Sequence, residues 1–133
     1  MRLTRAASYA LYAMVHIAGH KPNDAPLASH EIAQAHNIPE RFLLKVLKPL
    51  VSAGLLLSVK GPRGGYRLAK PATQITMLEV VEAVEGPIRG HASFHSKAAS
   101  NGLERKLDSV CHKAAEETRR QLNSVRISQL ADL

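Results

Sequence analysis

Residues 53 to 68, Ala-Gly-Leu-Leu-Leu-Ser-Val-Lys-Gly-Pro-Arg-Gly-Gly-Tyr-Arg-Leu, hold two short apolar runs on either side of a glycine-rich, positively charged turn. The runs, residues 55–59 and 66–68, have the composition of β-strands. The turn between them contains Gly61, Pro62, Gly64 and Gly65. These residue types supply backbone torsions that side chains with a Cβ resist, so the stretch predicts a β-hairpin.

Three cations, Lys60, Arg63 and Arg67, lie on this hairpin. The apolar pattern upstream predicts a helix that ends at Ala53, with Gly54 as a left-handed stop. A cationic hairpin directly after such a helix is typical of the wing of a winged helix-turn-helix, whose partner is a phosphate backbone.

The positive charge of the chain is confined to its first half. The net charge is +7, and residues 1–70 hold ten Lys and Arg against three acids, whereas residues 71–133 hold eight of each. A basic half joined to a neutral half indicates a nucleic-acid-binding module followed by a module with another task. A basic membrane-surface protein would show the same balance, but no basic amphipathic helix with an aromatic face accompanies it.

The length and composition limit the possible classes of protein. A chain of 133 residues can bury one core, or one compact domain plus an elongated helix. A single cysteine excludes a disulfide framework and a four-cysteine zinc site. No apolar run is long enough to span a membrane and no signal peptide precedes Tyr9, so we expect a cytoplasmic protein. Without a phosphate loop, an activated nucleophile or a paired set of acids, we expect no enzyme activity.

Helical periodicity predicts three helices before the hairpin. Leu11, Met14, Val15 and Ala18 form an apolar face on a first helix over residues 4–20. Ser29 is placed to cap a short second helix, and Pro39 suits the first position of a third helix that runs to Ala53.

The third helix has two contrasting faces. Its apolar face lies toward the expected core, while Arg41, Lys45 and Lys48 form a cationic stripe on the other side. Pro49 removes one backbone hydrogen bond near the end of this helix, which predicts a kink or a carbonyl facing solvent.

After the hairpin, Thr76 to Glu79 has the pattern of a capping box that starts a fourth helix, and Gly86-Pro87 stops it. Residues 86–102 show no periodicity. From Leu103 onward, apolar and small residues recur at steps of three and four, which predicts one seam along a long helix. The seam consists of Leu103, Leu107, Val110, Cys111, Ala114, Thr118 and Leu122, continuing to Val125. One helix cannot cover such a seam, so we expect a second copy of the chain to do so in a two-fold dimer.

Several motifs together resemble the Rrf-two family of bacterial transcription regulators. They are Ser8-Tyr9-Ala10-Leu11-Tyr12-Ala13, Glu31-Ile32-Ala33, Phe42-Leu43, Ala53-Gly54-Leu55, Gly61-Pro62-Arg63-Gly64-Gly65-Tyr66 and Leu78 to Gly86. The resemblance is close over residues 1–86 and looser over 103–133. It implies a mainly α fold, with a winged helix-turn-helix and a two-stranded wing at 1–86, a flexible effector-type loop at 87–102, and a dimerisation helix with a C-terminal turn at 103–133.

The resemblance also implies a function and a binding surface. Members are homodimers that bind short palindromic promoter sites on double-stranded DNA, so we expect a transcriptional regulator, and a repressor in particular. Residues 39–48 would enter the major groove. The implied DNA contacts are Arg5, Tyr9, Ser29, Pro39, Glu40, Arg41, Lys45, Lys48 and, beside Gly64 and Gly65 in the wing, Lys60, Arg63 and Arg67.

Simpler interpretations stay open for parts of this surface. The stripe of Arg41, Lys45 and Lys48 can be a merely solvated face, and Tyr9 can be a core residue with its hydroxyl at the surface. A winged helix can also serve as a protein-interaction module without binding DNA, although that use gives no reason to gather +7 in one half.

The chain departs from the family at its cysteines. Many members hold an iron-sulfur cluster with three cysteines near the loop, whereas this loop has none and the only thiol is Cys111. We therefore expect no cluster and no metal. His91, His95 and His112 lack a ligand spacing that would make a metal site with Cys111, and they fit surface histidines better. Regulation would come from a partner protein, from a small molecule at the loop and seam, or from oxidation of Cys111, which is the redox-sensing alternative.

Overall fold

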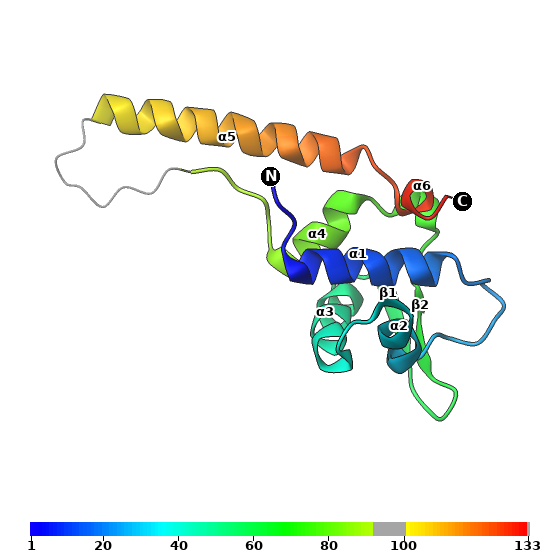
Figure 1. Ribbon diagram of the computed structural model, residues 1–133. Helices are drawn as coiled ribbons and strands as arrows, with labels where there is room; N and C mark the ends of the chain where they lie inside the picture. The colour runs from blue at the N-terminus through cyan, green and yellow to red at the C-terminus, as the bar shows by residue number, and fades with distance from the viewer. Residues whose placement is uncertain (92–100, 133) are drawn as a thin grey trace.

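The computed structural model describes residues 1–91 and 101–132 (Figure 1). The elements are α1 (Arg5–Ala18), α2 (Ser29–His36), α3 (Glu40–Ser52), β1 (Leu56–Val59), β2 (Gly65–Leu68), the short 3₁₀ helix η1 (Ala72–Gln74), α4 (Met77–Glu85), α5 (Asn101–Asn123) and α6 (Ile127–Leu130). The helical domain and its two-stranded hairpin agree with the mainly α fold predicted from the sequence.

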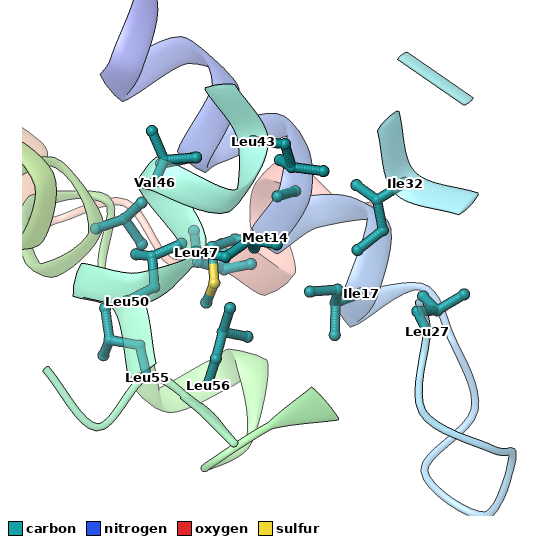
Figure 2. Close-up of a cluster of buried hydrophobic side chains, with 14 of the residues drawn as sticks. Met14, Ile17, Leu27, Ile32, Leu43, Val46, Leu47, Leu50, Leu55 and Leu56 are labelled. Carbon is teal, nitrogen blue, oxygen red and sulfur yellow. The ribbon is translucent and has the colours of Figure 1, made fainter. Parts of the chain in front are cut away.

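The main core is aliphatic and joins all of the N-terminal elements. Met14 of α1, Ile32 of α2, and Leu43, Leu47 and Leu50 of α3 are fully buried and meet in one cluster (Figure 2). Burying such a side chain stabilises the fold by about 1.5 to 3 kcal/mol. Because these residues come from three successive helices, the cluster fixes α3 relative to α1 and α2.

The buried face of α1 is shifted from the predicted one, although Met14 is fully buried as expected. The residues with no exposed surface are Ala7, Ala10, Ala13 and Met14, whereas Leu11, Val15 and Ala18 are only half-buried. Almost every turn of α1 is apolar, so periodicity alone did not single out one stripe. Alanines occupy the innermost positions because α3 and α4 both pack closely against this helix.

The helix boundaries follow local hydrogen bonding. Thr4 caps α1 by accepting from Ala7 N at 3.1 Å. The predicted capping box of α4 is present, with Glu79 N donating to Thr76 Oγ1 at 3.1 Å and Thr76 N donating to Glu79 Oε2 at 3.4 Å. These local signals were readable from the sequence because both partners lie within one turn.

Two predicted caps are displaced by one residue. Ala28 occupies the N-cap of α2 without a side-chain hydrogen bond, so the prediction that Ser29 caps this helix is wrong. Pro39 is the N-cap of α3, and the first helical residue is Glu40. Asn37, in the left-handed conformation with φ 52°, makes the turn between the two helices. The helix α3 continues through Pro49 to Ser52.

The hairpin is antiparallel and pairs Leu56 with Leu68 and Val59 with Gly65. An isolated β-bridge joins Leu27 to Tyr66 of β2, in which Tyr66 N donates to Leu27 O at 2.7 Å and Leu27 N donates to Tyr66 O at 3.0 Å. A Cβ on Gly65 would lie 2.3 Å from Leu27 O, and its φ is +155°. Only glycine fits at position 65, where the wing passes the backbone of Leu27.

The C-terminal residues pack into the main core. Ile127 of α6 is fully buried there, Ile127 N donates to Ile75 O at 2.9 Å, and Met77 N donates to Val125 O at 2.8 Å. The C-terminal turn, expected to belong with the dimerisation helix, packs instead in the core of residues 1–86. Among residues 1–91 and 101–132, none of the helices has the length and apolarity that a membrane crossing needs.

Candidate nucleic-acid interface

Three elements lie on the side of the domain that faces away from α5. In Figure 1 the helix α5 runs along one side of the molecule, while α2, α3 and the tip of the hairpin lie on the other. The short turn at Asn37 joins α2 to α3, and the strand pairing at Leu27 fixes the hairpin to the segment before α2. The helix-turn-helix and the wing are therefore held together as one unit.

The outer face of α3 carries the predicted cationic stripe. Arg41, Lys45 and Lys48 are all exposed, and within the described residues none of them lies within ion-pair distance of a carboxylate. Their charges are therefore not neutralised by the protein itself. Lys45 Nζ lies 5.6 Å from the centre of the Phe42 ring, a cation–π contact that keeps the amine on this face.

Two exposed apolar residues lie near the cationic stripe, and the charge pattern alone did not predict them. Phe42 is 49% exposed and Leu44 is 44% exposed. Large apolar side chains are expensive to leave in water, and in a major groove they can contact thymine methyl groups. The signal was present in the sequence, since both residues fall outside the apolar face that Leu43 and Leu47 define.

Glu40 links the two helices of the helix-turn-helix. Ser29 Oγ, in the first turn of α2, donates to Glu40 Oε1 in the first turn of α3 at 2.8 Å. The bond holds the carboxylate beside the N-terminal end of α2. The same two residues were expected to contact DNA separately, and the structure places them together.

The tip of the wing presents two cations. Lys60 and Arg63 are exposed, and the part of the chain that the structure describes places no carboxylate within ion-pair distance of either. Gly64 N donates to Gly61 O at 2.9 Å and closes the turn. A Cβ on Gly64 would lie 2.2 Å from Val59 O, so the turn requires glycine there.

Arg67 does not project with the other two hairpin cations. Its Nη1 donates to Pro22 O and its Nη2 to Asp24 O, each at 3.3 Å, so the half-buried side chain braces the loop between α1 and α2. Arg67 was expected among the DNA contacts of the wing, and the structure shows that two of its N–H groups bond within the domain instead of projecting from the wing tip. Its position on β2 directs it to the inner side, where two backbone carbonyls accept its protons.

The two α1 residues expected to contact DNA differ in their exposure. Arg5, in the first turn, is exposed, whereas Tyr9 is half-buried and packs against the main core. The alternative interpretation of Tyr9, a core residue that keeps some surface, describes its packing.

The apolar seam of α5 divides into two lines. Leu107 is 37% exposed, Val110 is 65% exposed and Ala114 is exposed, so this line is not covered by the chain's own residues. Leu122 is buried against Ala7, Leu78 and Val81. Leu122 therefore holds α5 on its own domain, and the prediction that it lies in a seam with a second copy is wrong.

The line of Leu107, Val110 and Ala114 is the outer line of α5, and Leu103, which is 54% exposed, continues it. Cys111 and Thr118 are half-buried and lie nearer the inner line, which contains Leu122. Residues 86–91 run close beside α5: a Cβ on Gly90 would lie 1.9 Å from Cys111 O. Arg119 of α5 forms an ion pair with Glu82 of α4. These contacts orient α5 so that Leu107, Val110 and Ala114 face outward.

Some of the residues considered as metal ligands in the sequence lie within the described part of the chain, and others do not. Among residues 1–91 and 101–132 no three His, Cys, Asp or Glu side chains are grouped as metal ligands. His95 and residues 92–100 of the predicted loop lie outside the described residues.

A histidine pair not expected from the sequence joins α1 to α2. His16 Nδ1 and His36 Nε2 are 2.9 Å apart, and Tyr12 stacks on the His36 ring with centroids 5.5 Å apart. Burial, and then the nearby charges of His36 and His20, lower the pKa of His16 below its usual 6.5. The lowered pKa favours the neutral form of the His16 ring, whose Nδ1 faces His36 Nε2 across the contact between the two helices.

The family model described as an iron-dependent transcriptional regulator, Rrf2, matches residues 3–133. The chain is 42% identical to protein aau3 of Rhizobium meliloti over 87 residues, which cover 64% of this chain and 54% of that protein. It is 33% identical to the transcriptional regulator IscR of Photobacterium profundum over 131 residues, covering 98% of this chain and 75% of that protein. For some curated relatives the match thus spans only about half of their length.

Solved structures show the same fold. The structure of CymR, the global cysteine regulator of Bacillus subtilis, superposes with a TM-score of 0.77 at 25% identity, covering 99% of this chain and 97% of that one. A structure of IscR superposes with a TM-score of 0.77 at 23% identity, covering 99% of this chain and 87% of that one.

Proposed function

The chain belongs to the Rrf2 (Rrf-two) family of transcriptional regulators, and from this membership we propose that it represses transcription in the cytoplasm by binding a palindromic promoter site as a homodimer. The observation that carries the proposal is the set of exposed, unneutralised cations on α3 and at the wing tip. Phosphates attract such cations whatever the base sequence, which gives affinity before specificity.

The two cationic elements have separate roles in this proposal. The helix α3 enters the major groove, where Arg41, Lys45 and Glu40 read base edges and Phe42 contacts apolar base surface. Lys60 and Arg63 at the wing tip contact the adjacent backbone and minor groove, while Arg5 and Lys48 contact phosphates. Arg67 is left out of this set because two of its N–H groups donate to backbone carbonyls of the α1–α2 loop and hold the side chain against that loop.

The outer face of α5 supplies the dimer contact. Leu107, Val110 and Ala114 form an uncovered apolar line on a helix of 23 residues. A two-fold axis along this line would bury it against its own copy and place two winged domains side by side. Two such domains match the two halves of a palindrome, and a bound dimer represses by occupying the promoter.

Binding is expected to weaken steeply as salt rises, because cations that meet phosphates release counterions. Replacing Arg63 by alanine removes one exposed phosphate contact that no protein group balances. It should weaken binding to every DNA sequence and lower the slope of log affinity against log salt by about one. Fluorescence anisotropy titrations over a salt series measure both quantities.

Lys45→Ala is the matched comparison, since it also removes one cation but from the groove-facing helix. It should change the preference among operator variants, which Arg63→Ala should leave unchanged. A flat salt dependence would contradict the proposed function, and normal binding by Arg63→Ala would remove the wing from it.

An iron-sulfur cluster does not fit this chain. The matched family is described as iron-dependent, yet the sequence holds one cysteine, and Cys111 lies half-buried within α5 beside the backbone of Gly90. One thiolate per chain cannot supply the set of cysteine ligands that such clusters use. We propose that DNA binding is independent of iron. Regulation then comes from a partner protein, from a small molecule or from the oxidation of Cys111.

Protein purified without oxygen is accordingly expected to be colourless and to bind DNA equally well before and after treatment with a chelator. Visible absorption, iron analysis and the anisotropy titration test this expectation. Stoichiometric iron with a visible band that disappears in Cys111→Ser would contradict it. Loss of a peroxide response in the same variant would instead favour the thiol as the sensor.

A further inference from the structure

A cavity of about 690 Å³ opens at the C-terminal end of α1, on a part of the domain used by neither α3 nor the outer face of α5. The α1–α2 loop, β2, η1 and α6 meet there (Figure 1). Its volume lies within the range of about 300 to 1,000 Å³ that small-molecule sites occupy.

The cavity walls are mainly apolar. They include Ile17 and Ala18 of α1, Leu68 of β2, and Pro71 and Ala72 at the start of η1. Such walls bind a hydrocarbon body by removing it from water, with a gain of roughly 25 cal/mol for each Å² buried. They offer little to a small inorganic ion.

The polar groups that line the same cavity are predominantly cationic. Lys21, Arg67 and Lys70 contribute three positive charges, and Asp24 is the acid among the lining residues. Lys70 forms an ion pair with Glu79, with its Nζ 3.3 Å from Glu79 Oε2. Lys21 and Arg67 have no carboxylate within ion-pair distance among the described residues, so the cavity has an excess of positive charge.

Arg67 is the distinctive member of this group. It is half-buried, two of its N–H groups donate to the carbonyls of Pro22 and Asp24, and its Nε is buried without an acceptor in the part of the chain that the structure describes. A guanidinium has five N–H donors in all, so donors remain. A partly desolvated, unneutralised guanidinium favours an anion beside it.

We propose that this cavity binds a monocarboxylate with an apolar body of about six to ten carbon atoms, and that this ligand is an effector of the regulator. The carboxylate lies near Arg67 and Lys21, and the hydrocarbon lies against Ile17, Leu68 and Ala72.

The effector part of the proposal rests on the proposed DNA-binding function. The cavity shares β2 and the α1–α2 loop with the wing, because Tyr66 of β2 is paired with Leu27. A ligand that contacts both segments changes how firmly the hairpin is held. Ligand and DNA affinities are then linked reciprocally.

Octanoate is a suitable probe, with 1-octanol and octylammonium as neutral and cationic controls of the same length. Isothermal titration calorimetry of the full chain without DNA should show octanoate binding at one site per subunit and at least about tenfold weaker binding of both controls. Absence of octanoate binding, or equal binding of octanol, would overturn the proposal.

Three variants locate the site. Arg67→Gln removes the guanidinium charge and Ala72→Phe fills the cavity, and each should weaken octanoate binding by about tenfold or more. Lys21→Glu, at an exposed position where the fold is not at risk, should weaken it by at least about threefold. Lys113→Gln removes one exposed cation on α5 and should leave the affinity unchanged. Octanoate binding that is unchanged in Lys21→Glu and in a folded Ala72→Phe would place the ligand elsewhere and overturn the assignment.

The effector role is tested separately. Octanoate should change the affinity of the wild-type protein for operator DNA by at least about threefold, and should have no effect on Ala72→Phe. Octanoate binding without any change in DNA affinity would overturn the effector part. Failure to bind DNA at all would contradict the proposed function while leaving the calorimetric test of the cavity intact.

Discussion

Ala114→Glu is expected to convert the proposed homodimer into monomers and to weaken binding to a palindromic operator by at least about 100-fold. Ala114 lies on the outer line of α5 with Leu107 and Val110. A carboxylate there would be desolvated against its own symmetry mate, and two like charges in an apolar contact oppose association. The loss on DNA is large because the second half-site is bound at the high effective concentration that the dimer provides.

Ser109→Glu is the matched control. It introduces the same carboxylate five positions away, on an exposed and opposite part of the helix surface. Light scattering should show a dimer for the control and a monomer for Ala114→Glu, and circular dichroism should show equal helix content in both. A dimeric Ala114→Glu would mean that the subunits associate through another surface.

Gly65→Ala should cost roughly 2 to 4 kcal/mol of folding free energy and abolish high-affinity DNA binding. Two independent features of Gly65 require glycine: its φ of +155°, and the position of Leu27 O, 2.3 Å from the added Cβ. The methyl group must push the hairpin away from Leu27, which breaks the two hydrogen bonds between Leu27 and Tyr66. The wing then loses its fixed position relative to α3.

Gly61→Ala separates backbone strain from this collision. Gly61 has a φ of +108°, and a Cβ there would meet nothing within 4 Å. It should be destabilised by only about 1 kcal/mol, with much of its DNA binding retained. Chemical denaturation and anisotropy on the same samples give both comparisons. Equal destabilisation of the two variants would show that torsion alone, and not the contact with Leu27, requires glycine in the wing.

The features predicted correctly from the sequence depend on contacts between near neighbours. The hairpin turn around Gly61 and Gly64 and the capping box at Thr76 each involve residues within a few positions of one another. The composition of such a segment fixes its backbone with little help from the rest of the fold. The stripe of Arg41 and Lys45 was equally readable, because the opposite face of α3 is so clearly apolar.

The features that were missed depend on residues far apart in the chain. The role of Arg67 depends on carbonyls 43 and 45 positions away, and nothing in the hairpin indicates which side it faces. The division of the α5 seam depends on Leu78 and Val81 of α4, which bury Leu122. The cavity at the end of α1 requires α1, the α1–α2 loop, β2, η1 and α6 to converge, so no single stretch of sequence contains its signal.

The packing of Ile127 in the main core has a consequence for co-translational folding on the ribosome. The wing, α3 and α4 emerge first, whereas Ile127, which joins the main core and whose N–H donates to Ile75 O, leaves the exit tunnel only later. A nascent chain released only as far as α4 therefore exposes apolar surface while the wing is already complete. The half of the chain that is proposed to contact DNA is thus synthesised before its core can be completed. We expect a stalled or truncated translation product to be recognised by chaperones and proteases rather than to bind DNA.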